Sequence, residues 1–137
     1  MRIHHLALRT RRLAKLAHFY RRVLGLSHLR TNRAAGRVRS VWLEAGRAIL
    51  MLERADPKEP AIPRGSLELV AFAVSRAEHR RMLARLERLG VPLDGEPTAF
   101  TTYFRDPDGR RVAISHFAPV SPDPRRDAKR KKRTSLA

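Results

Sequence analysis

The first part of the chain alternates between apolar and polar positions and then changes to a helical spacing. Residues 3–9, IHHLALR, alternate with a period of two, which predicts a strand. The two faces of this strand carry Leu6 with Leu8, and His5 with Ala7. After Thr10, a predicted helix cap, apolar residues recur at helical spacing up to Gly25, which is placed to end the helix. The apolar face of the helix comprises Leu13, Leu16, Ala17, Tyr20, Val23 and Leu24.

Three more strands are predicted before a proline-rich stretch. A weak strand is expected near residues 28–32, and residues 37–44 and 47–53 are typical of a hairpin that turns at Ala45-Gly46. Residues 54–65 contain three prolines, which predicts a linker because proline cannot donate a backbone hydrogen bond inside an element.

The same order of elements then recurs. Residues 66–74, SLELVAFAV, predict a strand, and Ser75 with Glu78 forms a capping-box signature for a second helix. This helix is predicted to end at Gly90, and a short strand is expected over residues 91–95. The apolar face of the second helix comprises Met82, Leu83, Leu86 and Leu89.

The last predicted element is a tight hairpin. Two β-prone runs, residues 101–105 and 111–117, flank Asp106-Pro107-Asp108-Gly109. Proline fixes φ at the second position of a type I turn, and glycine supplies the left-handed residue that closes it. This register places Asp106 opposite Arg110, Arg105 opposite Arg111, and Tyr103 opposite Ala113.

The repeated order predicts an α+β fold made of two βαβββ modules. We expect residues 1–118 to form one domain, with modules at 1–54 and 66–118 and a linker at 55–65. Eight strands would form a curved mixed sheet around a cleft. Residues 119–137 have no apolar periodicity and are predicted to be a basic, disordered tail.

Composition and charge limit the classes of function. The chain has 137 residues and no cysteine, which excludes disulfides, a thiol nucleophile and a thiolate metal site. No apolar run is long enough to span a bilayer and no secretory signal is visible, so a cytoplasmic protein is expected. The net charge is +17, and it is concentrated in residues 1–56 and in the tail. Such a distribution favours anionic ligands and weak binding of polyanions through the tail.

Four motifs together resemble the vicinal oxygen chelate superfamily. They are the strand His5–Leu8, the helix segment FYRRVLGL at Phe19–Leu26, the strand Leu69–Val74, and Tyr103–Ala113 with its DPDG turn. The superfamily includes glyoxalase I, extradiol dioxygenases, fosfomycin- and bleomycin-resistance proteins and methylmalonyl-CoA epimerase. The resemblance implies paired βαβββ modules, a homodimer, and either metal-dependent chemistry or plain binding of a small molecule.

The resemblance also implies four metal-ligand positions, and this sequence keeps a ligating side chain at one of them. The matching positions are His5, Met51, Leu69 and Ala113. A single imidazole cannot hold a divalent ion, so no metal and no other cofactor is expected. The alternative is an enzyme with displaced ligands, for which Glu53 and Glu68 are the candidates.

Strand alternation predicts which side chains line the cleft instead. The wall combines apolar, aromatic and hydroxyl groups, which is the usual make-up of a small-molecule pocket. The predicted ligand-binding residues are His5, Ser40, Trp42, Met51, Leu69, Thr101, Tyr103, Ala113 and Ser115. No catalytic residue is assigned, because no second titratable group accompanies His5.

These observations favour a metal-free binder of a small organic molecule, similar to the bleomycin-resistance type. The ligand is expected to be planar or aromatic, and anionic because the first half is basic. One alternative is a metal-dependent lyase, epimerase or dioxygenase that uses a divalent ion. A second alternative is a polyanion-associated module acting through residues 125–133.

Overall fold

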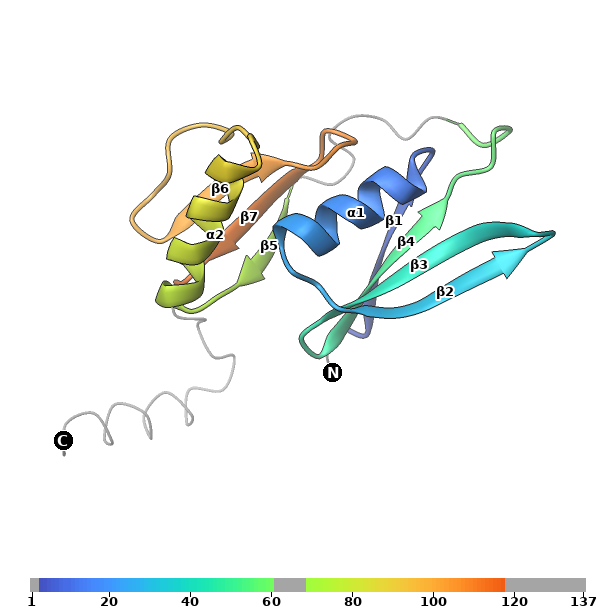
Figure 1. The fold of residues 1–137 in the computed structure, drawn as a ribbon, viewed down its shortest axis with the longest axis horizontal. Coiled ribbons are helices and arrows are strands. Elements are labelled where there is room, and N and C mark those ends of the chain that lie inside the picture. The colour runs from blue at the N-terminus through green and yellow to red at the C-terminus, as the bar shows by residue number, and fades with distance from the viewer. Residues whose placement is uncertain (1–2, 61–68, 118–137) are drawn as a thin grey trace.

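The computed structural model describes residues 3–60 and 69–117, which contain two helices and seven strands (Figure 1). In chain order these are β1 (His5–Thr10), α1 (Leu13–Val23), β2 (His28–Ala34), β3 (Arg37–Ala45), β4 (Ala48–Arg54), β5 (Val70–Ala73), α2 (Arg76–Arg88), β6 (Thr101–Arg105) and β7 (Arg111–Ser115). The start of the predicted strand 66–74, including Glu68, and the predicted tail 119–137 lie outside the described residues.

Each half of the chain repeats one pattern of strand pairing. Sheet A has the order β1-β4-β3-β2, with β1 parallel to β4. Sheet B has the order β5-β7-β6, with β5 parallel to β7. All other neighbouring strands are antiparallel. The predicted α+β class with two similar modules is therefore confirmed, but two mixed sheets take the place of one curved sheet.

The second module has one strand fewer than predicted. In the stretch 91–95, only Leu93 pairs with a strand, through an isolated bridge to Phe104. Pro92 has no N–H to donate to a ladder, and Gly95 adopts a left-handed φ of 85°. The chain therefore bends away after a single bridge, and the described part has seven strands instead of eight.

The helix starts differ from each other. Helix α2 has the predicted capping box, in which Ser75 Oγ accepts from the Glu78 N–H and Glu78 Oε2 accepts from the Ser75 N–H. Helix α1 has its N-cap at Arg12 without a side-chain cap, so the predicted cap at Thr10 is wrong. Thr10 Oγ1 instead accepts the Arg12 N–H at 2.9 Å and stabilises the turn before the helix. Both helices are followed by a glycine with positive φ, as predicted: Gly25 and Gly90.

The hairpins follow the predicted registers with one small shift. β3 pairs with β4 through Ala45 and Ala48, so the turn residues are Gly46 and Arg47 instead of Ala45 and Gly46. In the last hairpin, Arg105 pairs with Arg111 and Tyr103 with Ala113, as predicted. The Asp106 N–H donates to the Arg110 carbonyl at 3.0 Å, which confirms the third predicted pair.

Helix α1 joins the two modules into one hydrophobic core. Every residue of its predicted apolar face is buried. Toward sheet B, the Phe19 ring lies 6.2 Å from Phe104 and the Tyr20 ring lies 6.4 Å from Phe72. Its other core contacts are with β3 and β4 of sheet A. The helix therefore holds two sheets together that share no strand pairing.

The apolar face of α2 is narrower than the sequence pattern predicts. Leu86 is buried, whereas Leu83 is 37% exposed. His79, which was not assigned to the core, is only 5% exposed. The buried stripe therefore runs through His79, Met82, Leu86 and Leu89, which leaves Leu83 at its margin.

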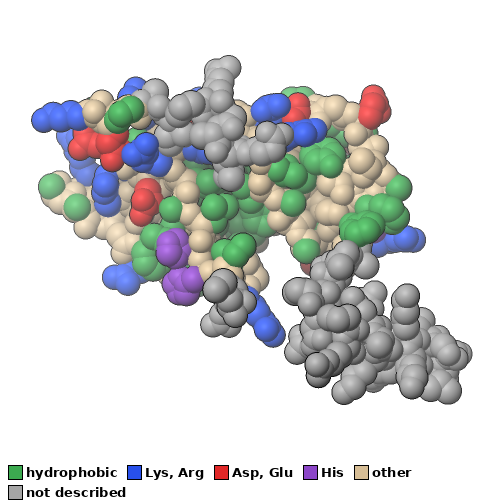
Figure 2. All heavy atoms as spheres, turned by 180° about the vertical axis from the view of Figure 1, so that it is seen from behind, with side chains coloured by type: hydrophobic (Ala, Val, Ile, Leu, Met, Phe, Trp, Pro, Cys, Tyr) green, Lys and Arg blue, Asp and Glu red, His purple; other side chains and the backbone are tan. Residues whose placement is uncertain are grey.

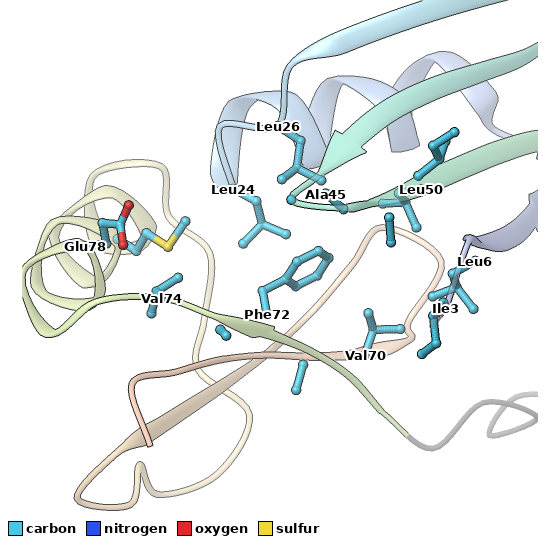
Figure 3. Close-up of a pocket in the computed structure, with 16 residues that line it drawn as sticks. Ile3, Leu6, Leu24, Leu26, Ala45, Leu50, Val70, Phe72, Val74 and Glu78 are labelled. Carbon is cyan, nitrogen blue, oxygen red and sulfur yellow. The ribbon is translucent and has the colours of Figure 1, made fainter. Parts of the chain in front are cut away.

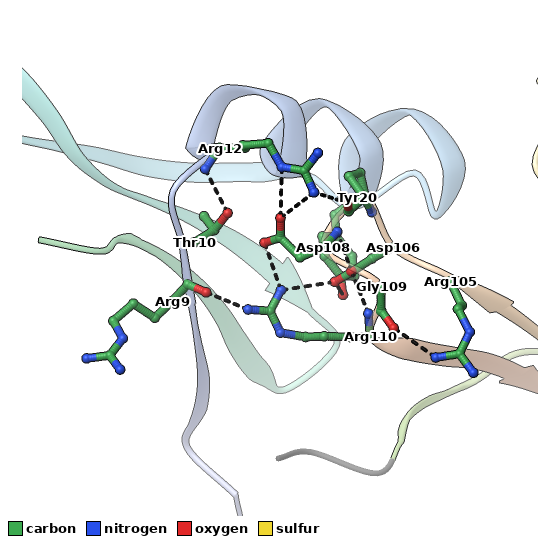
Figure 4. A network of polar contacts seen from close by, with 10 residues as sticks. Arg9, Thr10, Arg12, Tyr20, Arg105, Asp106, Asp108, Gly109 and Arg110 are labelled. Atoms are coloured by element: carbon green, nitrogen blue, oxygen red, sulfur yellow. Dashed lines mark hydrogen bonds and ion pairs between the residues drawn. The ribbon is translucent and has the colours of Figure 1, made fainter. Parts of the chain in front are cut away.

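A buried carboxylate anchors α1 to the last hairpin (Figure 4). Asp106 Oδ2 accepts the hydroxyl of Tyr20 at 3.0 Å and a guanidinium N–H of Arg110 at 3.3 Å. Asp106 Oδ1 accepts the backbone N–H groups of Asp108 and Arg110. Burial and then the charge of Asp106 raise the pKa of the Tyr20 phenol, which keeps it protonated as a donor. Asp106, which the sequence predicts only as part of the turn, therefore also makes a tertiary contact with α1.

Asp108 carries the outer half of this network. Its carboxylate pairs with Arg12 Nη2 at 3.1 Å and with Arg110 Nη1 at 3.0 Å. Burial by itself would raise the pKa of Asp108, but hydrogen bonds from Thr10, Arg110 and Arg12 outweigh it and the pKa is lowered. The folded protein therefore binds this proton more weakly than the unfolded chain does.

This difference predicts how stability depends on pH. Because the folded pKa is lowered, the stabilisation is present above about pH 4, the usual pKa of an aspartate, and is lost as pH falls through the folded pKa. At pH 6, urea unfolding should show that Asp108→Asn is less stable than wild type, and this difference in unfolding free energy should close as the pH falls through the lowered pKa of Asp108. A gap that stays constant from neutral to acidic pH would contradict this assignment.

Candidate functional site

Four of the predicted ligand-binding residues lie on one face of sheet A, opposite α1. Met51 is the Cα partner of both Ala7 and Trp42, so these three residues form one row across β1, β4 and β3. His5 pairs with Ile49 in the row before it, and Ser40 pairs with Glu53 in the row after it. The predicted grouping of His5, Ser40, Trp42 and Met51 on one face is therefore what the strand register produces.

Trp42 occupies the middle of this face with an unused donor. The Arg30 guanidinium lies over its ring, 5.6 Å from the ring centroid. The Trp42 Nε1–H is buried and has no acceptor among the described residues. The neighbouring Ser40 hydroxyl accepts from Asn32 Nδ2 at 2.9 Å. A buried donor without a partner is uncommon in folded proteins and suits an acceptor supplied by a ligand.

His5 stands at the exposed edge of the same face. Its Nδ1 lies 2.9 Å from Nδ1 of His4, and both side chains are exposed. β1 is an edge strand, which leaves its first residues uncovered. Figure 2 shows two histidine side chains next to each other on the surface, with hydrophobic side chains close by.

The residues around His5 do not fit the metal site that the family resemblance implies. The row of His5 contains Ile49, and the next row contains Ala7 and Met51, none of which ligates a divalent ion. Glu53 lies four positions beyond Ile49 on β4, about 13 Å along the strand, whereas a shared ion needs both ligands within about 2–2.5 Å. In residues 3–60 and 69–117, no three His, Asp or Glu side chains are grouped as metal ligands.

The remaining predicted residues belong to sheet B and form a second group. Thr101 pairs with Ser115, and their hydroxyl oxygens lie 2.8 Å apart. Tyr103 pairs with Ala113, and the Arg111 guanidinium lies 4.3 Å from the Tyr103 ring centroid. Leu69 directly precedes β5. No strand pairing joins this group to the sheet A group.

An apolar cavity lies between the modules, and none of the nine predicted residues lines it (Figure 3). Its volume is about 500 Å³. Leu6 and Leu50 form one side, Phe72 and Val70 the other, and Glu78 of α2 lies at one end. Strand alternation places Val70 and Phe72 on the same face of their predicted strand, and Leu6 on the face of the first strand that carries Leu8. The cavity itself could not be predicted, because it depends on how far apart the two sheets lie.

A pair of histidines in the second module, one buried and one partly buried, was also missed. His79 Nδ1 lies 2.6 Å from His116 Nδ1, and His79 Nε2 lies 2.8 Å from Thr102 Oγ1. Burial and then the nearby His116 lower the pKa of His79. The pair is therefore a structural contact in which one ring donates and the other accepts. The sequence did contain a signal for the burial of His79, because its helical spacing from Met82 and Leu86 puts it on the same face of α2.

The described part of the chain contains no helix that is both long and apolar enough to cross a membrane.

The comparisons with known proteins agree on one fold. The model of the Glyoxalase/Bleomycin resistance protein/Dioxygenase superfamily matches residues 2–114. A lactoylglutathione lyase from Agrobacterium tumefaciens is 27% identical, with a TM-score of 0.62 over 83% of this chain and 92% of that one. An integron cassette protein from the mobile metagenome of V. cholerae is 25% identical, with a TM-score of 0.64 over 86% and 96%.

A third solved structure, a glyoxalase/dioxygenase from Nostoc punctiforme, is 22% identical, with a TM-score of 0.67 over 82% of this chain and 88% of that one. No significant match was found among curated proteins.

Proposed function

The chain belongs to the Glyoxalase/Bleomycin resistance protein/Dioxygenase superfamily, and from this premise we propose that it binds a small organic molecule on the uncovered face of sheet A without a metal ion. The observation that carries the proposal is Trp42, whose buried Nε1–H has no acceptor among the described residues. The ligand supplies that acceptor and stacks on the indole ring.

The surroundings of Trp42 define the chemical class of the ligand. Met51 and Ala7 lie in the same row of sheet A as Trp42, and their side chains provide an apolar surface against which a planar group can pack. Arg30 lies over the ring and supplies a positive charge for a carboxylate or phosphate. A planar aromatic acid therefore matches both the ring and the charge.

The proposal assigns binding and not turnover to this face. The donor set around His5 does not fit a divalent ion, for the reasons of register given above. Among residues 3–60 and 69–117, the hydrogen-bond partner of the His5 ring is His4, and no carboxylate is bonded to it that could complete an acid–base pair. Shape, apolar area and charge remain, and these support affinity.

Binding can be read from the protein's own fluorescence, because Trp42 is its only tryptophan. We expect planar aromatic carboxylates to quench this emission and to raise the melting temperature, and their uncharged amides to bind more weakly. Tyr103→Ala removes the other aromatic ring among the predicted ligand-binding residues, and so tests whether the ligand also contacts sheet B. Trp42→Ala has no tryptophan, so its binding is followed by the melting temperature; it should weaken binding about tenfold or more, since it removes buried aromatic area and an aromatic contact worth roughly 1 kcal/mol beyond burial.

The control variant is Phe100→Ala, which removes a half-exposed aromatic ring from the second module. It should leave the affinity unchanged. If a ligand binds Trp42→Ala as tightly as it binds wild type, its binding site lies in another cavity. Consumption of the ligand, or binding lost on adding a chelator, would revive the metal-dependent lyase, epimerase or dioxygenase alternative.

A further inference from the structure

Helix α1 presents a row of basic side chains to solvent. Lys15, His18, Arg21 and Arg22 are exposed, and each lies three or four residues from another member of the set. Arg11 continues the row just before the helix. From Arg11 to Arg22 the row spans about 16 Å. The sequence has no acidic residue before Glu44, so α1 itself carries no carboxylate.

The ion pairs of the described residues lie elsewhere. Their cations are Arg9, Arg12, Arg105, Arg110 and Arg111. Within residues 3–60 and 69–117, none of the five side chains in the row takes part in an ion pair. The charges of Arg11, Lys15, Arg21 and Arg22 are therefore available to an external anion.

The row ends in a polar pocket of about 380 Å³. His18, Arg21 and Arg22 line it from α1, and Ser27 and His28 line it from the following segment. Two guanidinium groups, a hydroxyl and two imidazoles converge there, and guanidinium groups match the geometry of phosphate oxygens.

Two neighbouring groups determine the charge at the mouth of this pocket. Glu44 is close, because its N–H donates to the Ser27 carbonyl at 2.9 Å, but its carboxylate does not line the pocket. Arg85 of α2 donates to the Val23 carbonyl at 3.2 Å, at the C-terminal end of α1. Its charge offsets the negative end of the helix dipole, which would otherwise repel an anion.

We propose that the outer face of α1 and this pocket form a docking surface for the phosphate backbone of a nucleic-acid duplex. A duplex offers phosphates at regular intervals along a line, which a row of basic side chains can follow. The row contains no aromatic residue for stacking on the bases of a single strand. The apolar face of α1 is buried in the core, so it is not available to insert into a lipid surface.

The surface is independent of the proposed small-molecule face. Helix α1 covers one face of sheet A, and Trp42 lies on the other. Both sites can therefore be occupied at once. The location also differs from the tail residues 125–133 that the sequence suggested for polyanion binding.

The test compares three full-length variants that each lose three positive charges. The helix variant is Lys15→Gln, Arg21→Gln, Arg22→Gln, and glutamine keeps the helix propensity. The hairpin variant is Arg33→Gln, Arg37→Gln, Arg47→Gln, at exposed positions of sheet A. The tail variant is Arg130→Gln, Lys131→Gln, Lys132→Gln. Binding of a labelled DNA duplex of arbitrary sequence is followed by anisotropy between about 50 and 200 mM salt.

We expect the helix variant to lower the salt slope, log K against log [salt], by about 2–3, because each lost phosphate contact contributes about 0.9. Its affinity should fall at least about tenfold at 100 mM salt, while the hairpin variant binds within about twofold of wild type. Circular dichroism and a melting curve confirm that the variants fold.

Four results would overturn the proposal. They are no duplex binding by wild type at low salt, equal losses in all three variants, a loss confined to the tail variant, and binding of phosphatidylserine vesicles without binding of DNA. Equal losses would indicate net charge alone, and the last result would identify a membrane surface as the partner.

Discussion

Replacing Asp106 with alanine is expected to lower the free energy of unfolding by about 3–5 kcal/mol, the usual cost of removing one partner from a buried ion pair. The Asp106 side chain is fully buried and Arg110 is nearly so. The substitution also leaves the Tyr20 hydroxyl and two backbone N–H groups without their acceptor. Urea unfolding at neutral pH measures the change.

Asp56→Ala is the matched control. Its carboxylate accepts the Lys58 N–H at 2.9 Å in an exposed turn, without a buried partner. It should cost less than about 1 kcal/mol. If both variants lose the same stability, the contribution of Asp106 is limited to local turn geometry. Tyr20→Phe, which removes only the hydroxyl, should then behave like wild type instead of losing about 1–2 kcal/mol.

Phe104→Ala is expected to destabilise the protein by about 3–5 kcal/mol, the typical cost for an aromatic residue in a core. Phe104 is fully buried and lies beside Phe19 of α1, so its ring fills space between the two modules. The loss combines buried apolar area with a cavity that the surrounding side chains only partly refill. Thermal and urea unfolding should agree on the size of the effect.

Phe100→Ala provides the comparison for Phe104. Phe100 is 42% exposed and contacts His116 and Phe117 near the end of sheet B. The same truncation there should cost about 1 kcal/mol or less, because much of the ring already contacts water. A Phe104→Ala variant as stable as Phe100→Ala would mean that the modules do not share a core.

The candidate site could be predicted from sequence only within each sheet. Strand alternation correctly placed Trp42 and Met51 on one face, and Tyr103 and Ala113 on another, because the side-chain period of a strand is two. It could not show that Ala113 is fully buried. It also could not show that Arg30 lies over Trp42 or that Trp42 Nε1 lacks an acceptor, since both depend on strand pairing and side-chain conformation.

The sequence by itself determined the family, the two repeated modules, the apolar face of α1 and the register of the last hairpin. These features follow from residue spacing and from local turn chemistry over a few positions. The tertiary structure decided the separation into two sheets, the cavity between them and the Tyr20–Asp106 bond. Each of these depends on how two distant modules pack, which is set by the sum of many side-chain contacts and not by any local period.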